Sequence, residues 1–151
     1  MTKVKYKWDE EHGFAMCSIL YHDKSYVGIA QCHPDDDDFK SELVGSNLAY
    51  LRANIQLLQG IKNEKRIELK ALKTLYGSLT PSPKFNPKSF EAKVLLNQID
   101  IITEGIEFIK ECIQQLRNQI SHDIESSEQF YQGVRKNRKQ REDALKEQSN
   151  D

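Results

Sequence analysis

Three histidines and two cysteines fall within 22 residues near the start of the chain: His12, Cys17, His22, Cys32 and His33. Mixed sets of these side chains can bind zinc. However, the sequence has neither a CxxC nor an HxxxH spacing, and alternation along a strand would direct the side chains to different faces. Cysteine is also among the residue types most often buried in cores. The pattern therefore favours cysteines packed in a core, and it predicts no bound metal.

The other arrangements that could support catalysis are weaker. Cys32 and His33 are adjacent, but neighbouring residues of a strand point to opposite faces, which separates a thiol from its base. The acidic run at residues 35–38 lacks the glycine-punctuated loop of an EF-hand and is better suited to begin a helix. The chain also has no P-loop and no dinucleotide-binding glycine motif. The sequence predicts a protein that is not an enzyme and needs no cofactor.

A basic cluster lies near the C-terminus. Such a cluster can contact nucleic-acid phosphates without reading the base sequence. Cations near the C-terminal end of a helix also complement the helix dipole, and no aromatic residues are interleaved to stack on bases. The dipole explanation is favoured, and nucleic acid is kept as an alternative partner. The candidate phosphate contacts are Arg135, Lys136, Arg138, Lys139 and Arg141.

Composition limits the class of protein. A chain of 151 residues is most simply one domain, and a net charge of −1 provides no global attraction to nucleic acid or membranes. No stretch approaches the roughly 20 apolar residues of a membrane span, and the N-terminus lacks the apolar core of a signal peptide. Three scattered cysteines suggest reduced thiols. We therefore expect a cytoplasmic protein with no membrane partner.

Two long apolar ladders dominate the rest of the chain. Apolar residues recur at alternating steps of three and four from Leu48 to Tyr76, with an interruption at Lys62 and Lys65, and from Ile99 to Ile120. This pattern is typical of helices that bury a common seam. Prolines separate the ladders, and proline cannot continue a helix interior. The sequence predicts a coiled-coil-like antiparallel helical hairpin, with helix one at residues 39–77, a proline-rich turn at 78–87, helix two at 88–141 and a frayed tail at 142–151.

The expected helix ends follow from local residue preferences. Asp37 or Asp38 is the expected N-cap of helix one, and Gly77 suits the position just after its end. For helix two we expect Asn86 as the N-cap and Pro87 at the first helical position.

A small β element precedes the helices within residues 1–38. Two runs rich in β-branched and aromatic residues flank a polar turn between residues 13 and 33, which predicts a β-hairpin. An isolated hairpin is marginally stable in water. It must therefore pack on the helices, gain a third strand from residues 3–8, or pair with another subunit. The predicted fold class is mainly α with this small β element, in one domain.

The two predicted helices are unequal in length. Folding the chain in the proline-rich turn sets Ile120 opposite Gly45, so residues after about 125 extend past the start of helix one. An apolar stripe without a partner in its own chain must meet the β-hairpin or a second copy, and a second copy is the simpler alternative. We expect a homo-oligomer in which the overhang contributes Phe130, Tyr131 and Val134.

The same alignment sets Gly105 opposite Gly60. Glycine in a helix interior costs about 0.5–1 kcal/mol relative to alanine, so two glycines at one level suggest closely approaching helix backbones. Two tolerated surface glycines are the alternative.

Two motifs carry a resemblance to a known group of proteins. Residues 28–39 read Gly-Ile-Ala-Gln-Cys-His-Pro-Asp-Asp-Asp-Asp-Phe and are followed by Ser41-Glu42, Gly45, Ala49 and Arg52-Ala53, while residues 84–91 read Lys-Phe-Asn-Pro-Lys-Ser-Phe-Glu. Together they resemble small proteins of phages and prophages of Gram-positive bacteria, over most of residues 12–95. That group has no settled activity, so the resemblance assigns no functional residue. It implies a setting, the cytoplasm of an infected bacterium, in which small phage proteins often bind host defence machinery.

These observations favour a non-enzymatic binding module that engages a host protein and inhibits an antiviral defence system. Nucleic-acid binding through the basic end of helix two is one alternative. A sponge for a nucleotide signal is another, and it would need a pocket where Arg52, His33 and Tyr50 approach the β-hairpin.

Overall fold

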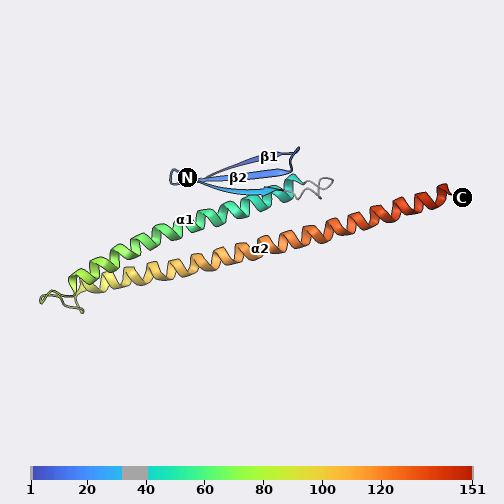
Figure 1. The fold of residues 1–151 in the computed structure, drawn as a ribbon. Coiled ribbons are helices and arrows are strands. Elements are labelled where there is room, and N and C mark those ends of the chain that lie inside the picture. Colours follow the sequence, from blue (N-terminus) through green and yellow to red (C-terminus); the bar gives the residue numbers. More distant parts are fainter. Residues whose placement is uncertain (1, 32–40, 151) are drawn as a thin grey trace.

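The chain forms a three-stranded sheet followed by two long antiparallel helices. The computed structural model describes residues 2–31 and 41–150. In Figure 1 the sheet lies on one side of α1 and α2 lies on the other, so α1 is the middle layer. The elements in chain order are β1 (Lys3–Asp9), β2 (Phe14–Tyr21), β3 (Lys24–Gln31), α1 (Glu42–Leu79) and α2 (Phe90–Ser149).

The predicted β-hairpin gains a third strand. The sheet order is β1-β2-β3, and both pairings are antiparallel. His22 and Asp23 connect β2 to β3 with φ angles of 47° and 62°, the left-handed conformation that tight two-residue hairpin turns require. Of the three ways to stabilise the hairpin, the chain therefore uses two, since the sheet also packs on α1.

Small side chains bring the sheet close to α1. The buried cluster at this interface contains Ala15, Cys17, Ile19 and Ala30 from the sheet and Ala49 and Ala53 from α1. Gly28 lies at the closest point, because a Cβ atom there would overlap the Ala49 carbonyl oxygen and the Ala53 amide nitrogen. Only a residue without a side chain allows this approach of strand to helix.

The two helix glycines have different surroundings. A Cβ atom on Gly60 would lie 2.5 Å from Cε1 of Tyr26, so this glycine makes room for a ring from β3. A Cβ atom on Gly105 would meet nothing within 4 Å. The close approach of helix backbones expected at these two glycines is therefore wrong: Gly60 accommodates the Tyr26 side chain, and Gly105 is a tolerated glycine.

A second core forms along the seam between the helices. Ile55 of α1 packs with Ile109 and Ile113 of α2, all less than a tenth exposed. Four partly buried residues extend this cluster: Leu58, Ile61, Leu116 and Ile120. The apolar ladders predicted from the sequence thus meet as expected.

Helix α1 begins and ends later than predicted. Ser41 is its N-cap, since its Oγ accepts a hydrogen bond from the Val44 amide at 3.3 Å. The predicted caps Asp37 and Asp38 lie outside the described residues. The helix continues through Gly77 to Leu79, because residue 77 keeps the helical conformation and Pro81 supplies the stop.

Helix α2 also differs at both ends. Ser89, whose Oγ accepts from the Ala92 amide at 3.2 Å, is the N-cap. The predicted cap Asn86 instead accepts from the Lys88 amide at 2.9 Å, a local turn that precedes the helix. At the other end the helix runs to Ser149, so the tail predicted to fray after residue 141 is helical.

The overhang of α2 is present, with a shifted register. The Asn47 amide donates to the Asp123 carboxylate at 2.9 Å, which sets residue 47 opposite 123, about five residues from the predicted alignment. The helix therefore passes the start of α1 near residue 129, and Figure 1 shows it continuing alone to the C-terminus. No helix in the described ranges has the length and apolar character needed to cross a membrane.

Candidate interaction surfaces

The side of the sheet that faces away from α1 is amphipathic. Alternation along each strand places one set of side chains against α1 and the other set outward. We call the outward set the outer sheet face. It consists of Lys3, Lys5, Lys7 and Asp9 from β1, Phe14, Met16, Ser18 and Leu20 from β2, and Ser25, Val27, Ile29 and Gln31 from β3.

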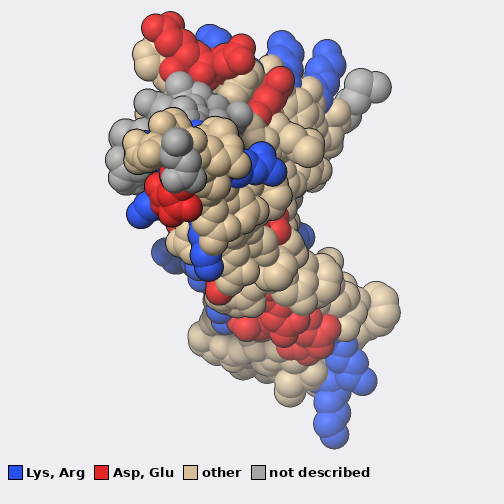
Figure 2. Space-filling view, turned by 90° about the vertical axis from the view of Figure 1, so that its right-hand side faces the viewer, with Lys and Arg blue, Asp and Glu red and all other residues tan. Residues whose placement is uncertain are grey.

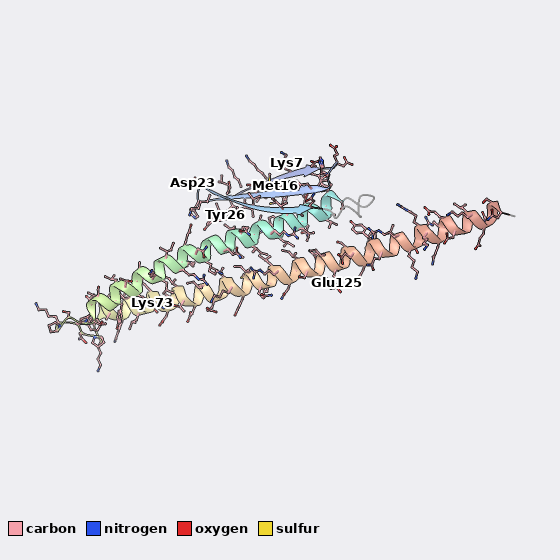
Figure 3. The ribbon with its side chains drawn as sticks, in the orientation of Figure 1. Lys7, Met16, Asp23, Tyr26, Lys73 and Glu125 are labelled. Carbon is pink, nitrogen blue, oxygen red and sulfur yellow. The ribbon has the colours of Figure 1, made fainter. Side chains whose placement is uncertain are left out.

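The strand register sets the three lysines of β1 beside the apolar residues of β2, which Ser18 interrupts, and beside the Val27–Ile29 pair of β3. Met16 pairs with Lys7 on one side and with Ile29 on the other. Figure 3 shows Lys7 and Met16 on the sheet, with Tyr26 on the side nearer α1. Val27 and Ile29 are 41% and 47% exposed, which is high for β-branched residues in a sheet. The face therefore presents apolar area that α1 does not cover.

An open groove lies where the edge of the sheet meets the start of α1. Tyr6 and Tyr50 approach each other there, with ring centroids 6.4 Å apart. Burial, followed by the electrostatic influence of Cys17 and Tyr50, raises the pKa of Tyr6. The groove has a volume of about 600 Å³ and is lined by Tyr6, Glu42, Leu43, Ser46, Asn47 and Tyr50.

This groove is poorly suited to a nucleotide. Its lining includes a carboxylate, that of Glu42, and no cation. Arg52, one of the three residues named for a nucleotide pocket, donates from Nη1 to the Ile29 carbonyl oxygen at 2.6 Å. His33 lies outside the described residues. Of the three residues named for the pocket, the structure places only Tyr50 in it.

The described cysteine and histidine residues do not converge. Cys17 is fully buried against α1, and burial raises the pKa of its thiol. His12 and His22 lie beyond opposite ends of β2, and Cys32 lies outside the described residues. The structure thus supports the core role for Cys17.

His12 takes part in a different small cluster. Its Nδ1 lies 2.8 Å from Asp9 Oδ2, and this hydrogen bond lowers the pKa of the Asp9 carboxyl group. Glu11 is close enough that the three side chains could share a cation. All three side chains are at the surface. The side chains of Asp9 and His12 already hydrogen-bond to each other without a cation.

The residues predicted to mediate self-association lie at the start of the overhang. Phe130 is 66% exposed, while Tyr131 and Val134 are half-buried. The rings of Phe130 and Tyr131 make an edge contact, with centroids 5.6 Å apart. The overhang thus keeps one large aromatic side chain in solvent.

The basic cluster surrounds the helix and does not form a single stripe. Arg135, Lys136, Arg138, Lys139 and Arg141 are all exposed, and at 100° per residue they occupy more than half of the helix circumference. Between residues 128 and 149 there are six cations and four carboxylates, and the carboxylates lie before and after the run 135–141. The face drawn in Figure 2 shows separate blue and red patches, and neither colour covers it. This mixture weakens the attraction to a phosphate backbone.

A second apolar stripe on α2 was missed in the sequence. Phe90, Val94, Ile101 and Phe108 are 78%, 37%, 59% and 66% exposed. They share one face because Val94, Ile101 and Phe108 are spaced by sevens and Phe90 precedes Val94 by four. This heptad signal was available, but the stronger ladder that forms the seam runs along the same stretch of α2 on another face.

Comparison of the chain with protein-family models, with curated proteins and with solved structures found no match.

Proposed function

We propose that the protein is a non-enzymatic binding module whose outer sheet face engages another protein. The observation that supports this is the exposed apolar area of Val27 and Ile29, next to the partly buried Met16 and a row of lysines. Isolated surface hydrophobics are normal, whereas a contiguous patch with a polar rim is typical of an interaction site.

The charge pattern indicates the chemistry of the partner. Successive lysines of β1 are about 7 Å apart, since alternate residues of a strand repeat at that distance. Acidic residues one turn apart on a helix repeat at about 5.4 Å, close enough for flexible lysine side chains to follow. The partner surface that fits is therefore an apolar stripe with carboxylates along one side.

The resemblance to phage proteins supplies the proposed setting. A small protein in an infected bacterium would meet host proteins, and occupying an apolar surface edged by carboxylates on a defence protein would inhibit it. The long hairpin contributes a rigid support for the sheet, because α1 is packed on two sides.

Capture from host lysate tests this proposal. The full chain is compared with a Lys3→Glu/Lys5→Glu/Lys7→Glu variant and with Val27→Asp, which places a charge in the Val27–Ile29 pair. A Lys73→Glu/Lys84→Glu/Lys88→Glu variant makes the same change in net charge far from the sheet. We expect the wild type and the distant variant to retain the same protein, and each outer-face variant to bind it at least about tenfold more weakly.

Two results would contradict the proposal. In one, the outer-face variants retain the partner as well as the wild type does. In the other, the retained material is nucleic acid, its binding falls steeply with salt, and it is lost in an Arg135→Glu/Lys136→Glu variant. The second result would establish the basic end of α2 as the binding site.

A further inference from the structure

The two edges of the sheet differ in how their backbone groups are used. In the tight hairpin between β2 and β3, Tyr21 and Lys24 flank the turn and form a hydrogen-bonded pair. Every second residue of β3, counted from residue 25, therefore turns its N–H and C=O groups away from β2. Ile29 is one of these residues, and its carbonyl oxygen accepts a hydrogen bond from Arg52 at 2.6 Å. A side chain of α1 thus occupies part of the β3 edge.

The same alternation leaves a row of backbone groups open along β1. The residues of β2 that bond to β3 direct no backbone group toward β1, so β2 bonds to the odd-numbered residues of β1. The even-numbered residues, Val4, Tyr6 and Trp8, therefore direct their N–H and C=O groups outward. No strand in the described ranges pairs with β1 on that side. The β1 edge can accept another strand.

An open groove runs beside this row of donors and acceptors. The side chains of the even-numbered residues lie on the α1 side of the sheet, and a Cβ atom on Gly45 would be 3.1 Å from the Trp8 ring. Tyr6 and Val4 are 56% and 41% exposed, because β1 lies farther from α1 than the other strands do (Figure 1). Tyr6 and Leu43 line opposite sides of the groove. The edge therefore offers backbone pairing together with space for side chains.

We propose that the β1 edge binds an extended segment of a partner protein as a fourth, antiparallel strand. Antiparallel pairing continues the pattern of the sheet and is slightly more stable per residue than parallel pairing. The residues of the segment opposite Val4, Tyr6 and Trp8 face the groove and are apolar. The residues between them lie beside the lysines of β1 and are acidic. Strand addition of this kind takes affinity from main-chain hydrogen bonds and specificity from alternate side chains.

The charges of β1 favour an acidic segment over a second copy of the strand. Two copies paired antiparallel about Tyr6 would set each Lys3 beside the other copy's Asp9. They would also set each Lys5 beside the other copy's Lys7, and like charges directly opposite are destabilising. A segment with three carboxylates would meet a lysine at each of them.

The other end of the edge carries the opposite charge. Asp9 ends β1, and Glu42, which lines the groove, lies one turn before the Gly45 that contacts Trp8. Two carboxylates therefore lie at this end. A basic residue of the segment fits opposite Asp9.

The proposed strand site goes beyond the proposed function. Val27 and Ile29, the exposed apolar pair of the outer sheet face, belong to β3 at the opposite edge of the sheet. Capture from lysate by the Val27→Asp variant reports on that face, whereas binding of an extended peptide reports on the β1 edge. Either proposal can therefore fail without the other.

A labelled peptide tests strand addition to the full chain by fluorescence anisotropy. Its sequence, Lys-Val-Glu-Val-Glu-Val-Glu, has the seven-residue length of β1. In antiparallel register it sets its lysine opposite Asp9 and its glutamates opposite the three lysines. N-methylation of its valines removes the N–H groups that face β1 and should abolish binding. N-methylation of its glutamates, whose N–H groups face away, should retain binding. Equal binding of the two methylated peptides, or no binding of the unmodified peptide, would overturn the proposal.

Matched proline variants locate the added strand. Val4 and Val27 are both 41% exposed, and each directs its N–H outward from one edge of the sheet. Proline there removes the outward N–H without removing a hydrogen bond of the sheet. Val4→Pro should weaken peptide binding at least about tenfold, and Val27→Pro should leave it unchanged.

Circular dichroism establishes that both proline variants fold. If Val4→Pro does not fold, the two methylated peptides decide the question on the wild type. Equal affinity of the two folded variants, or loss of binding only in Val27→Pro, would overturn addition at β1.

Discussion

The first half of α1 and the last third of α2 are both regular helix, yet their surroundings differ in every respect. Around Ala49 and Ala53, α1 has the sheet on one side, and Ile55 faces α2 on the other. Beyond about residue 134, α2 is exposed at every position. The two regions show that the apolar ladders hold α1 and α2 together as a hairpin. Small residues on α1 determine where the sheet can pack as a third layer.

The comparison also separates stability from binding. The residues that hold the molecule together are small or branched and fully buried, such as Cys17, Ala53 and Ile113. Large exposed side chains such as Phe108 and Phe130 contribute little to the fold of the single chain. They are the side chains available to other molecules.

The largest expected effect is at the contact between the sheet and α1. Gly28→Ala should lower the free energy of unfolding by about 4 kcal/mol, because the new methyl group would overlap backbone atoms of α1 that cannot move independently. Urea denaturation followed by circular dichroism measures this loss. The control is Gly77→Ala, an exposed helix position with no atom within 4 Å, which should stabilise by about 0.5–1 kcal/mol. Equal stability of the two variants would mean that the sheet does not pack on α1 at Gly28.

A smaller effect is expected in the seam. Ile113 is 4% exposed, and its replacement by alanine should cost about 3 kcal/mol, from lost burial and the remaining cavity. Leu145→Ala removes a side chain of the same size from the overhang, where it is 64% exposed, and should cost less than about 0.5 kcal/mol. Thermal or urea unfolding of both variants tests the contrast. A comparable cost at Leu145 would show that the end of α2 is packed against something in the folded protein.

The helical hairpin could be predicted because its seam repeats with the helical period over many turns. The β-hairpin could be predicted from its two β-rich runs, and residues 3–8 were recognised as one possible third strand. Helix ends were less predictable, since neighbouring candidates such as Asn86 and Ser89 compete and hydrogen-bond geometry decides.

The surfaces were harder to predict than the fold. The interface between the sheet and α1 depends on Gly28, Ala49 and Ala53, and small residues give almost no hydrophobic periodicity. The register of the helices depends on the length of the turn, so the start of the overhang was misplaced by several residues. Whether an apolar residue such as Ile101 is in the seam or beside it depends on helical phase, which the sequence pattern resolves only to a fraction of a turn.

Hydrogen exchange of the protein alone, resolved into peptides by mass spectrometry, tests most directly the claim that α1 is packed on two sides and the end of α2 on none. Protection should be highest in peptides covering residues 49–58, with opening free energies near that of global unfolding. It should be lower for the seam of α2 and close to zero for residues 135–149, where no apolar side chain is buried. Equal protection of residues 135–149 and 49–58 would contradict the account.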